Sequence, residues 1–260
     1  MPGGAEPGAS LVGRTLDVLG AFDERHPRLA LSEIARRAGL SPATTLRIVR
    51  ELVAGGALVR GEDRTYWIGR RIWALGLLAR VETDLRGIAS PYLHDIHAAT
   101  RAVVHLAVRE GEEVLYLDRI SGQSSTPVVS RVGGRLPLHC TGVGKVLLAH
   151  APEEVIRSVT SPDPAAPGGG LRRYTPYTVT SPGVLLRQLA RIRADGYATT
   201  QEEMTLGACS VAVPVPAEGA VVASIGVVVP DFRRERARLV GALTVAARAI
   251  GRAYAGTAAD

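Results

Sequence analysis

The sequence predicts an α+β protein made of two domains joined by a helix, and three observations carry this prediction. Three helical patterns and a β-hairpin pattern fill residues 10–70. A further helical pattern over residues 71–88 separates two regions of different composition. Over residues 89–256 hairpin-like strands stand apart from helices, the pattern of an antiparallel sheet with segregated helices. Residues 1–9, rich in Pro, Gly and Ala, are expected to form a disordered tail.

The N-terminal domain is predicted to consist of three short helices followed by a hairpin. Ser10 is a capping residue for the first helix, and Gly39 gives the second helix a left-handed stop. Ser41 caps the third helix and Pro42 takes its first position, where the missing N–H costs nothing. The predicted ranges are 10–22, 32–38 and 41–54 for the helices, and 58–60 and 65–68 for the strands.

Residues 71–88 carry apolar side chains at helical spacing, which predicts a linker helix. Its apolar stripe, which includes Ile72 and Leu75, needs a partner surface, either the protein's own body or a second subunit. In the C-terminal domain, Glu110 to Glu112 form a hairpin turn between two strand patterns. The strands are predicted over 105–109, 114–119, 128–132, 197–202, 210–215 and 221–229, and the helices over 141–149, 184–194 and 233–254.

Charge is unevenly distributed along the 260 residues. The chain has 31 basic and 25 acidic side chains, and Lys145 is its one lysine. Twelve basic and eight acidic residues precede residue 81, so most of the net charge of +6 lies in the first third. A local basic excess is the electrostatic footprint of a nucleic-acid-binding module, although a genome's preference for arginine produces the same count.

The composition indicates neither secretion nor membrane insertion. The longest apolar stretch, near Val221–Val229, is about half the length of a bilayer-spanning helix. The first ten residues lack the basic start and the apolar core of a signal peptide. Cys140 and Cys209 are too few for a disulfide framework or a four-cysteine zinc site. We therefore expect a cytoplasmic protein with free thiols.

The segment LSEIARRAGLSPATTLRIVREL, residues 31–52, has the pattern of a helix–turn–helix, in which the second helix enters the major groove of DNA. Leu46, Val49 and Leu52 are the predicted inner face of that helix. Its outward end carries short polar groups and arginines, which suit phosphates and base edges, and the hairpin forms a wing beside it. The candidate DNA-binding residues are Ser41, Pro42, Ala43, Thr44, Thr45, Arg47, Arg50 and, in the wing, Arg64. A three-helix packing module with a solvated basic face is the alternative.

From about Leu11 to Tyr254 the chain resembles the IclR-type bacterial transcriptional regulators. The resemblance rests on several motifs that occur in one order. They are the helix–turn–helix segment above, YWIGRRIWALG after the wing, LPLHCTGVGKVLLA at 136–149, YTPYTVTSP at 174–182, IRADGYATTQEEMTLGACSVAVPV at 192–215 and VVASIGVVVP at 221–230.

The resemblance implies a winged helix–turn–helix domain, a linker helix that dimerises, and a GAF-like C-terminal domain that binds a small organic effector. It also implies a homodimer or a dimer of dimers that binds a double-stranded DNA operator and represses or activates neighbouring catabolic genes. Aromatic acids and short keto acids are common effectors of such proteins.

The residues around position 142 suit a carboxylate. Thr141 to Gly144 open a predicted helix, and the free N–H groups at a helix start attract anions. By resemblance, Gly142 and Val143 donate these N–H groups to the effector. The other pocket positions fall at or beside Gln201, Cys209, Ser210, Ser224, Gly226 and Val228. Some relatives have acidic or serine side chains where this chain has Gln201, Gly226 and Val228, so we predict a less polar pocket and a bulkier or more aromatic organic acid.

Other chemistry has less support in the residues. The sequence GVGK at 142–145 is not a phosphate-binding Walker loop, because His139 and Val146 stand where that motif needs Gly and Ser or Thr. The two cysteines and His139 match no standard zinc spacing. We expect no cofactor, no bound metal and no catalytic residue. A GAF-like enzyme that uses Cys140 or Cys209 as its thiol is the alternative function.

Overall fold

The protein was analysed as a computed structural model that describes residues 10–23, 26–76, 83–122, 126, 128–160 and 171–257. The chain divides into two compact units, Met1–Val81 and Glu82–Asp260. Among the described residues, no helix has the length and apolar character needed to cross a membrane. The tail predicted at residues 1–9 lies outside the described residues.

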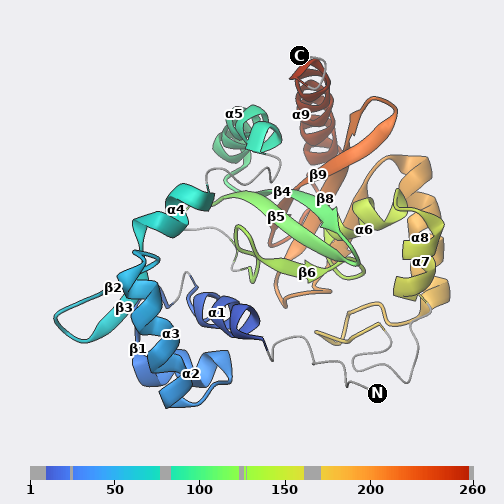
Figure 1. Ribbon diagram of the computed structural model, residues 1–260. Coiled ribbons are helices and arrows are strands. Elements are labelled where there is room, and N and C mark those ends of the chain that lie inside the picture. The colour runs from blue at the N-terminus through green and yellow to red at the C-terminus, as the bar shows by residue number, and fades with distance from the viewer. Residues whose placement is uncertain are drawn as a thin grey trace. The chain divides into compact units, whose positions relative to one another are not determined.

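The first unit is a three-helix cluster with a small antiparallel sheet (Figure 1). Its sheet has the order β1-β3-β2, and β1 is a two-residue strand that the sequence pattern did not reveal. The predicted helices and hairpin are confirmed. The elements are α1 Leu11–Gly20, β1 Leu29–Ala30, α2 Leu31–Ala38, α3 Pro42–Ala54, β2 Leu58–Arg60, β3 Thr65–Ile68 and α4 Arg70–Gly76.

Local signals explain where these helices begin and end. Ser10 Oγ accepts a hydrogen bond from Gly13 N at 3.0 Å, and Ser41 Oγ accepts one from Thr44 N at 3.3 Å. Gly39 ends α2 with φ of 65°, a left-handed conformation that glycine adopts without strain. The helices close over one apolar core built from Val18, Leu29, Ile34, Ile48, Val49, Leu58 and Tyr66.

The second unit is built on a six-stranded antiparallel sheet of order β6-β5-β4-β9-β8-β7. The hairpin turns between β4 and β5 and between β8 and β9 join strands that are neighbours in the sheet. The elements are α5 Thr83–Thr100, β4 Val103–Glu110, β5 Glu113–Ile120, β6 Arg135–Pro137, α6 Gly142–Ala149, α7 Glu153–Thr160, α8 Pro182–Asp195, β7 Ala198–Gln201, β8 Cys209–Ala217, β9 Ala220–Val229 and α9 Arg236–Thr257.

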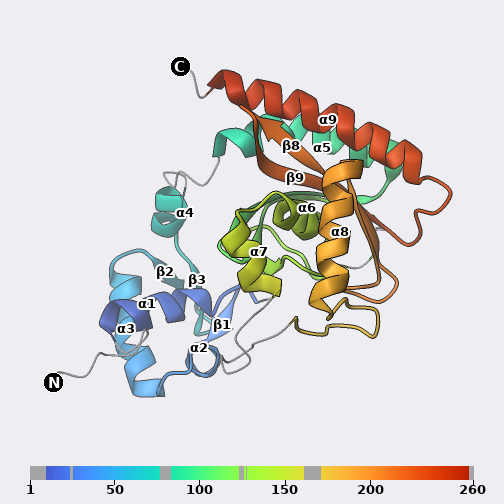
Figure 2. The same cartoon turned by 90° about the vertical axis from the view of Figure 1, so that its right-hand side faces the viewer.

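Helices cover both faces of this sheet, as Figure 2 shows. Helices α5 and α9 pack on one face, where Leu93, Val104 and Leu243 belong to the larger core. Helices α6, α7 and α8 pack on the other, where Leu148, Ala212 and Leu189 belong to the second core. The side chains of each strand alternate between these two cores, so a change of one position along a strand exchanges one core for the other.

Two sequence predictions need correction. The predicted strand over residues 128–132 is not a strand, and the side chain of its middle residue, Ser130, bonds His105 of β4. The predicted linker helix over 71–88 is described only at its ends: α4 ends at Gly76, residues 77–82 lie outside the described residues, and α5 runs on to Thr100. The last part of that prediction therefore belongs to a helix of the second unit.

Candidate functional site

Helix α3 presents one exposed stripe in the first unit. Ala43, Arg47 and Arg50 are all exposed, and their spacing of four and three residues places them on the same face of the helix. Ser41 and Pro42, at the start of the helix, are also exposed, and Thr44 is half-buried. Seven of the eight candidate DNA-binding residues are thus accessible to a partner, including Arg64 in the wing.

Thr45 is the exception. Its side chain is fully buried beside Ile48 and Val49, and its hydroxyl donates to the Ser41 carbonyl at 3.0 Å. The predicted inner face of Leu46, Val49 and Leu52 is therefore rotated, because a threonine satisfied by the carbonyl four residues back packs as a small apolar residue. Thr45 cannot reach a base edge from this position.

Arg47 and Arg50 differ in their surroundings. Arg47 borders a hollow of the first unit that is lined mainly by α1, α3 and α4, among them Leu11, Leu52 and Leu75. Arg50 does not line this hollow. Both side chains extend from the exposed stripe, but Arg50 stands clear of the apolar surface beside Arg47.

The wing is a tight hairpin with an arginine at its tip. Arg64 has a positive φ of 61°, and Asp63 accepts hydrogen bonds from the backbone and hydroxyl of Thr65, at 3.1 and 2.8 Å. These bonds lower the pKa of the Asp63 carboxyl below its ordinary value. At the base of the hairpin, the guanidinium of Arg28 stacks 4.5 Å from the ring centroid of Trp67.

A cavity opens in the second unit between the α6 side of the sheet and the segments that cover it. Counted with its opening to solvent, the empty space of this cavity is about 500 Å³. Its floor is formed by strand side chains, one wall by the start of α6, and the others by residues 128–130 and 204–208. The strand residues of the floor are His105, Tyr116, Thr200, Ser210, Ala212, Gly226 and Val228.

The start of α6 fits closely against the sheet. Thr141 caps this helix by accepting a hydrogen bond from Gly144 N at 3.2 Å. A Cβ on Gly142 would lie closer than 3.0 Å to Ser210 Oγ, so only glycine allows the helix to approach β8 in this way. Gly142 and Val143, the first residues of this helix, line the cavity, and a helix start favours an anion.

Five of the eight predicted effector-binding residues line the cavity: Gly142, Val143, Ser210, Gly226 and Val228. The other three predicted residues do not line the cavity. Gln201 is exposed at the end of β7, and Cys209 points into the core on the opposite face of the sheet. Ser224 is fully buried and donates to the Val213 carbonyl at 2.9 Å. Strand alternation explains the second case, because Ser210 faces the cavity and its neighbour Cys209 therefore cannot.

Four polar side chains in the cavity were missed by the sequence interpretation. His105 Nε2 lies 2.7 Å from Ser130 Oγ, and Thr200 Oγ1 lies 2.6 Å from Ser210 Oγ. The ring of Tyr116 packs edge-on against His105, with 5.0 Å between centroids. Burial lowers the pKa of His105 to about 3, helped by the positive charge of Arg119, so its imidazole is neutral at physiological pH. The one sequence signal for these residues was a histidine, His105, within a predicted strand.

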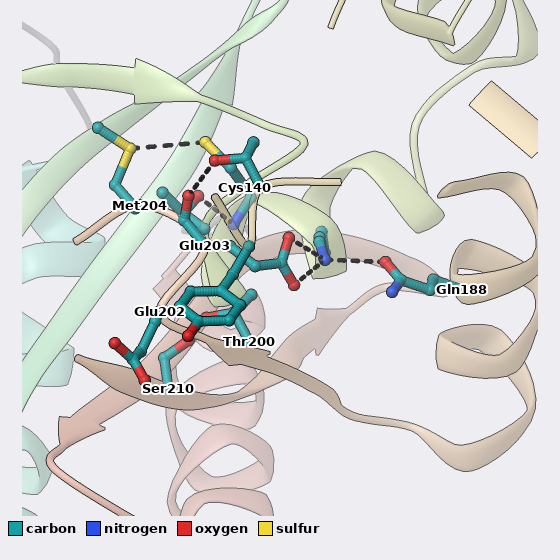
Figure 3. Close-up of polar contacts among 12 residues, drawn as sticks. Cys140, Gln188, Thr200, Glu202, Glu203, Met204 and Ser210 are labelled. Carbon is teal, nitrogen blue, oxygen red and sulfur yellow. Dashed lines mark hydrogen bonds and ion pairs between the residues drawn. The ribbon is translucent and has the colours of Figure 1, made fainter. Parts of the chain in front are cut away.

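A buried ion pair connects α6 with the loop that walls the cavity. Lys145 Nζ donates to both carboxylate oxygens of Glu203 and to Gln188 Oε1, and Figure 3 shows Glu203 and Gln188 converging on this ammonium group. The hydroxyl of Thr178 donates to the Glu203 carbonyl at 2.6 Å and so holds the loop from the other side. In the next residue, Met204 Sδ lies 3.5 Å from Cys140 Sγ.

The two thiols are poor nucleophiles. Burial raises the pKa of Cys140 to about 12, and burial also raises the pKa of Cys209. Both side chains are therefore protonated at neutral pH, whereas a reactive cysteine needs a thiolate. Within the described ranges, no three His, Cys, Asp or Glu side chains are placed to hold a metal ion.

Comparison with known proteins identifies the family of each unit. Residues 11–62 match the family model described as the IclR helix-turn-helix domain, and residues 78–252 match the one described as bacterial transcriptional regulator IclR C-terminal. The regulator XynR of Escherichia coli is 31% identical over 78% of this chain and 79% of its own length. The repressor AllR of Salmonella typhi is 29% identical over 92% of this chain and 88% of its own.

A solved structure extends the likeness to the whole fold. An IclR homologue from Microbacterium hydrocarbonoxydans, complexed with 4-hydroxybenzoate, is 36% identical and superposes with a TM-score of 0.85, covering 94% of this chain and 98% of that one. The relatives of the present chain are named as a transcriptional regulator and a transcriptional repressor, so the alternative of a thiol enzyme finds no support. The chain belongs to the IclR family of bacterial transcriptional regulators.

Proposed function

We propose that this regulator binds its operator through the exposed stripe of α3 and the wing, and that an aromatic carboxylic acid in the cavity of the second unit controls that binding. The observation that carries the proposal is that Gly142 and Val143, the first residues of α6, line the cavity, and the backbone N–H groups of a helix start would bind a carboxylate. Because its partner is chromosomal DNA, the protein acts in the cytoplasm.

The aromatic class is supported by the lining and by a relative. Val128, Val143, Leu136 and Val228 give the cavity apolar walls, as a ring requires. The 4-hydroxybenzoate of the Microbacterium homologue is a ligand of this class in a protein 36% identical to this one. The effector changes operator binding only as far as its affinity differs between the DNA-binding and the released arrangement.

We also propose that the protein works as a homodimer or a dimer of dimers. Leu11 and Leu16 of α1 and Trp73 and Leu75 of α4 are each more than half exposed, which is costly for large apolar side chains gathered on two helices of one unit. A second copy of the chain would cover them and would place two α3 helices on two half-sites. Light scattering on the purified protein measures this directly: a monomer at micromolar concentration contradicts the proposal.

The test of function is a gel-shift titration of the full-length protein. Labelled fragments from the DNA flanking its gene are competed with random duplex, with and without 4-hydroxybenzoate. We expect one fragment to be bound in preference to the competitor, and the acid to change its apparent affinity. Equal binding of all fragments in both conditions contradicts the proposal.

A further inference from the structure

Strand β7 forms one edge of the sheet in the second unit, and a polar hollow lies beside it. Among the described strands, β7 pairs with β8 alone. Counted with its opening to solvent, the empty space of this hollow is about 860 Å³. The β7 hollow is lined by Lys145, Gln188, Arg191, Ile192, Asp195, Tyr197, Thr199 and Arg236. It shares no lining residue with the cavity at the start of α6.

One hydrogen bond shows which backbone groups of β7 point outward. Glu202 N donates to the Ala208 carbonyl at 3.0 Å, so this N–H points toward β8. In a trans peptide the N–H and C=O groups point in opposite directions, so the carbonyl of Gln201 points away from β8. Because residues of an extended strand alternate, the N–H and C=O groups of Thr199 and Gln201 lie on the outer side. Among the described residues, no other group bonds them.

The β7 hollow also carries positive charge. Arg191 and Arg236 are both exposed, and in the part of the chain that the structure describes neither guanidinium has an ion pair or a hydrogen bond. Asp195 is the one acidic residue of the lining, and Lys145 is already bound by Glu203. The hollow therefore favours a partner with acidic side chains.

The two arginines belong to helices on opposite faces of the sheet. Arg191 lies in α8, and Arg236 is the first residue of α9. A strand added beside β7 would direct its successive side chains toward these two faces in turn. Two adjacent acidic residues would therefore each meet one arginine.

We propose that the free edge of β7 binds an extended segment of a partner protein that carries two adjacent acidic residues. The backbone of this segment exchanges hydrogen bonds with Thr199 and Gln201 and adds a strand to the sheet. Its carboxylates pair with Arg191 and Arg236. Backbone bonds alone would accept any extended chain, so the two arginines supply the specificity.

The experiment measures peptide binding to the full-length protein by fluorescence anisotropy. The probe is the labelled peptide acetyl-VTEETV-amide, and its matched control is acetyl-VTQQTV-amide, which has the same shape without the charges. Because two exposed ion pairs are at stake, we expect the acidic peptide to bind about fivefold more tightly. An acidic peptide with N-methyl groups on its four central residues keeps the carboxylates but cannot donate backbone bonds, and we expect it not to bind.

The double variant Arg191→Gln with Arg236→Gln tests the charge contacts. It should reduce the preference for the acidic peptide to less than about twofold and still bind the glutamine peptide. Arg248→Gln is the matched control, because Arg248 is an exposed arginine of α9 outside the β7 hollow, and it should keep the full preference. Thermal unfolding shows that both variants remain folded.

Hydrogen exchange tests the strand edge itself. The acidic peptide should slow exchange of the Thr199 and Gln201 amides. The proposal is overturned if the acidic peptide fails to bind at about 1 mM, if the N-methylated peptide binds equally well, or if the double variant keeps the preference. Amides that exchange slowly in the free protein and become fast on dilution also overturn it, because a second copy of the chain then covers the edge.

Discussion

Lys145 Nζ lies 2.6 Å from Oε1 and 2.7 Å from Oε2 of Glu203, and both side chains are almost completely buried. The pair joins α6, whose first turn lines the cavity, to the loop that carries the cavity residues Met204 and Thr205. The only lysine in the sequence is thus a structural link between two walls of the effector cavity, rather than a surface charge.

Breaking this pair on one side should be costly. Burial lowers the pKa of Lys145 and raises the pKa of Glu203, so their attraction offsets only part of the cost of removing both charges from water. We expect Lys145→Met, which leaves Glu203 buried without its cation, to lower the free energy of unfolding by about 3–5 kcal/mol. Urea denaturation measures the change.

The double variant Lys145→Met with Glu203→Leu is the control. It removes both charges at once, so its stability should return to within about 1–2 kcal/mol of the unmodified protein. A double variant as unstable as the single one would show that the pair does not act as a unit.

His105 predicts a pH dependence of stability with a defined sign. Its pKa is near 3 in the folded protein and 6.5 without the fold, so between these values the unfolded chain binds more protons. This histidine therefore does not destabilise the fold above about pH 6.5. Between about pH 6.5 and pH 3, it lowers the free energy of unfolding by about 1.4 kcal/mol for each pH unit of acidification. His139, whose pKa is also lowered by burial, adds a contribution of the same sign.

The measurement compares unfolding free energies at pH 7 and pH 5 in the unmodified protein and in His105→Gln. At pH 5 the histidine accounts for about 2 kcal/mol, and the glutamine variant should lack this part of the loss. Since all other groups are shared, the difference between the two proteins isolates His105. Parallel pH profiles would exclude a neutral buried imidazole at this position.

Gly142 should not tolerate a side chain. The added Cβ of Gly142→Ala would collide with Ser210 Oγ and push the start of α6 away from β8. We expect a loss of about 1–3 kcal/mol of stability and a clear loss of carboxylate affinity, measured by urea denaturation and calorimetry. Gly87→Ala is the matched control, because a Cβ there meets open space on an exposed face of α5. It should leave acid binding unchanged and stabilise the helix slightly.

The sequence predicted those features that depend on residues adjacent in the chain, such as the starts of helices. Ser41 and Pro42 fixed the start of α3, and the glycines around position 142 marked the helix start beside the cavity. It was wrong at Thr45, because a threonine bonded to its own helix packs like an apolar residue, and at Cys209, because one step along a strand reverses the face.

The buried polar pairs of the second unit lay beyond such reasoning. His105 and Ser130 are 25 residues apart, and Lys145 and Glu203 are 58 apart. In both pairs the partners belong to different elements, so only the fold brings them together. The sequence showed a histidine within a predicted strand and a single lysine, but no nearby residue indicated which side chains they would bond.

Arg50 should contribute to operator binding through electrostatics. It lies on the exposed stripe of α3, clear of the hollow beside Arg47, so its guanidinium is free to approach a phosphate. Arg50→Ala and Arg47→Ala should each weaken operator binding, and each lost phosphate contact should reduce the slope of log affinity against log salt by about 0.9. Gel shifts at several salt concentrations give both quantities.

Two further variants separate DNA contact from net charge and from folding. Arg248→Ala removes an exposed arginine of α9 in the second unit, and it should leave the salt slope unchanged. Thr45→Ala should lower the unfolding free energy by about 1 kcal/mol, because it removes a buried methyl group and a hydrogen bond, but the folded fraction should keep the slope of the unmodified protein. If Arg50→Ala and Arg248→Ala have the same slope as the unmodified protein, Arg50 does not contact the phosphates, and the role assigned to it is wrong.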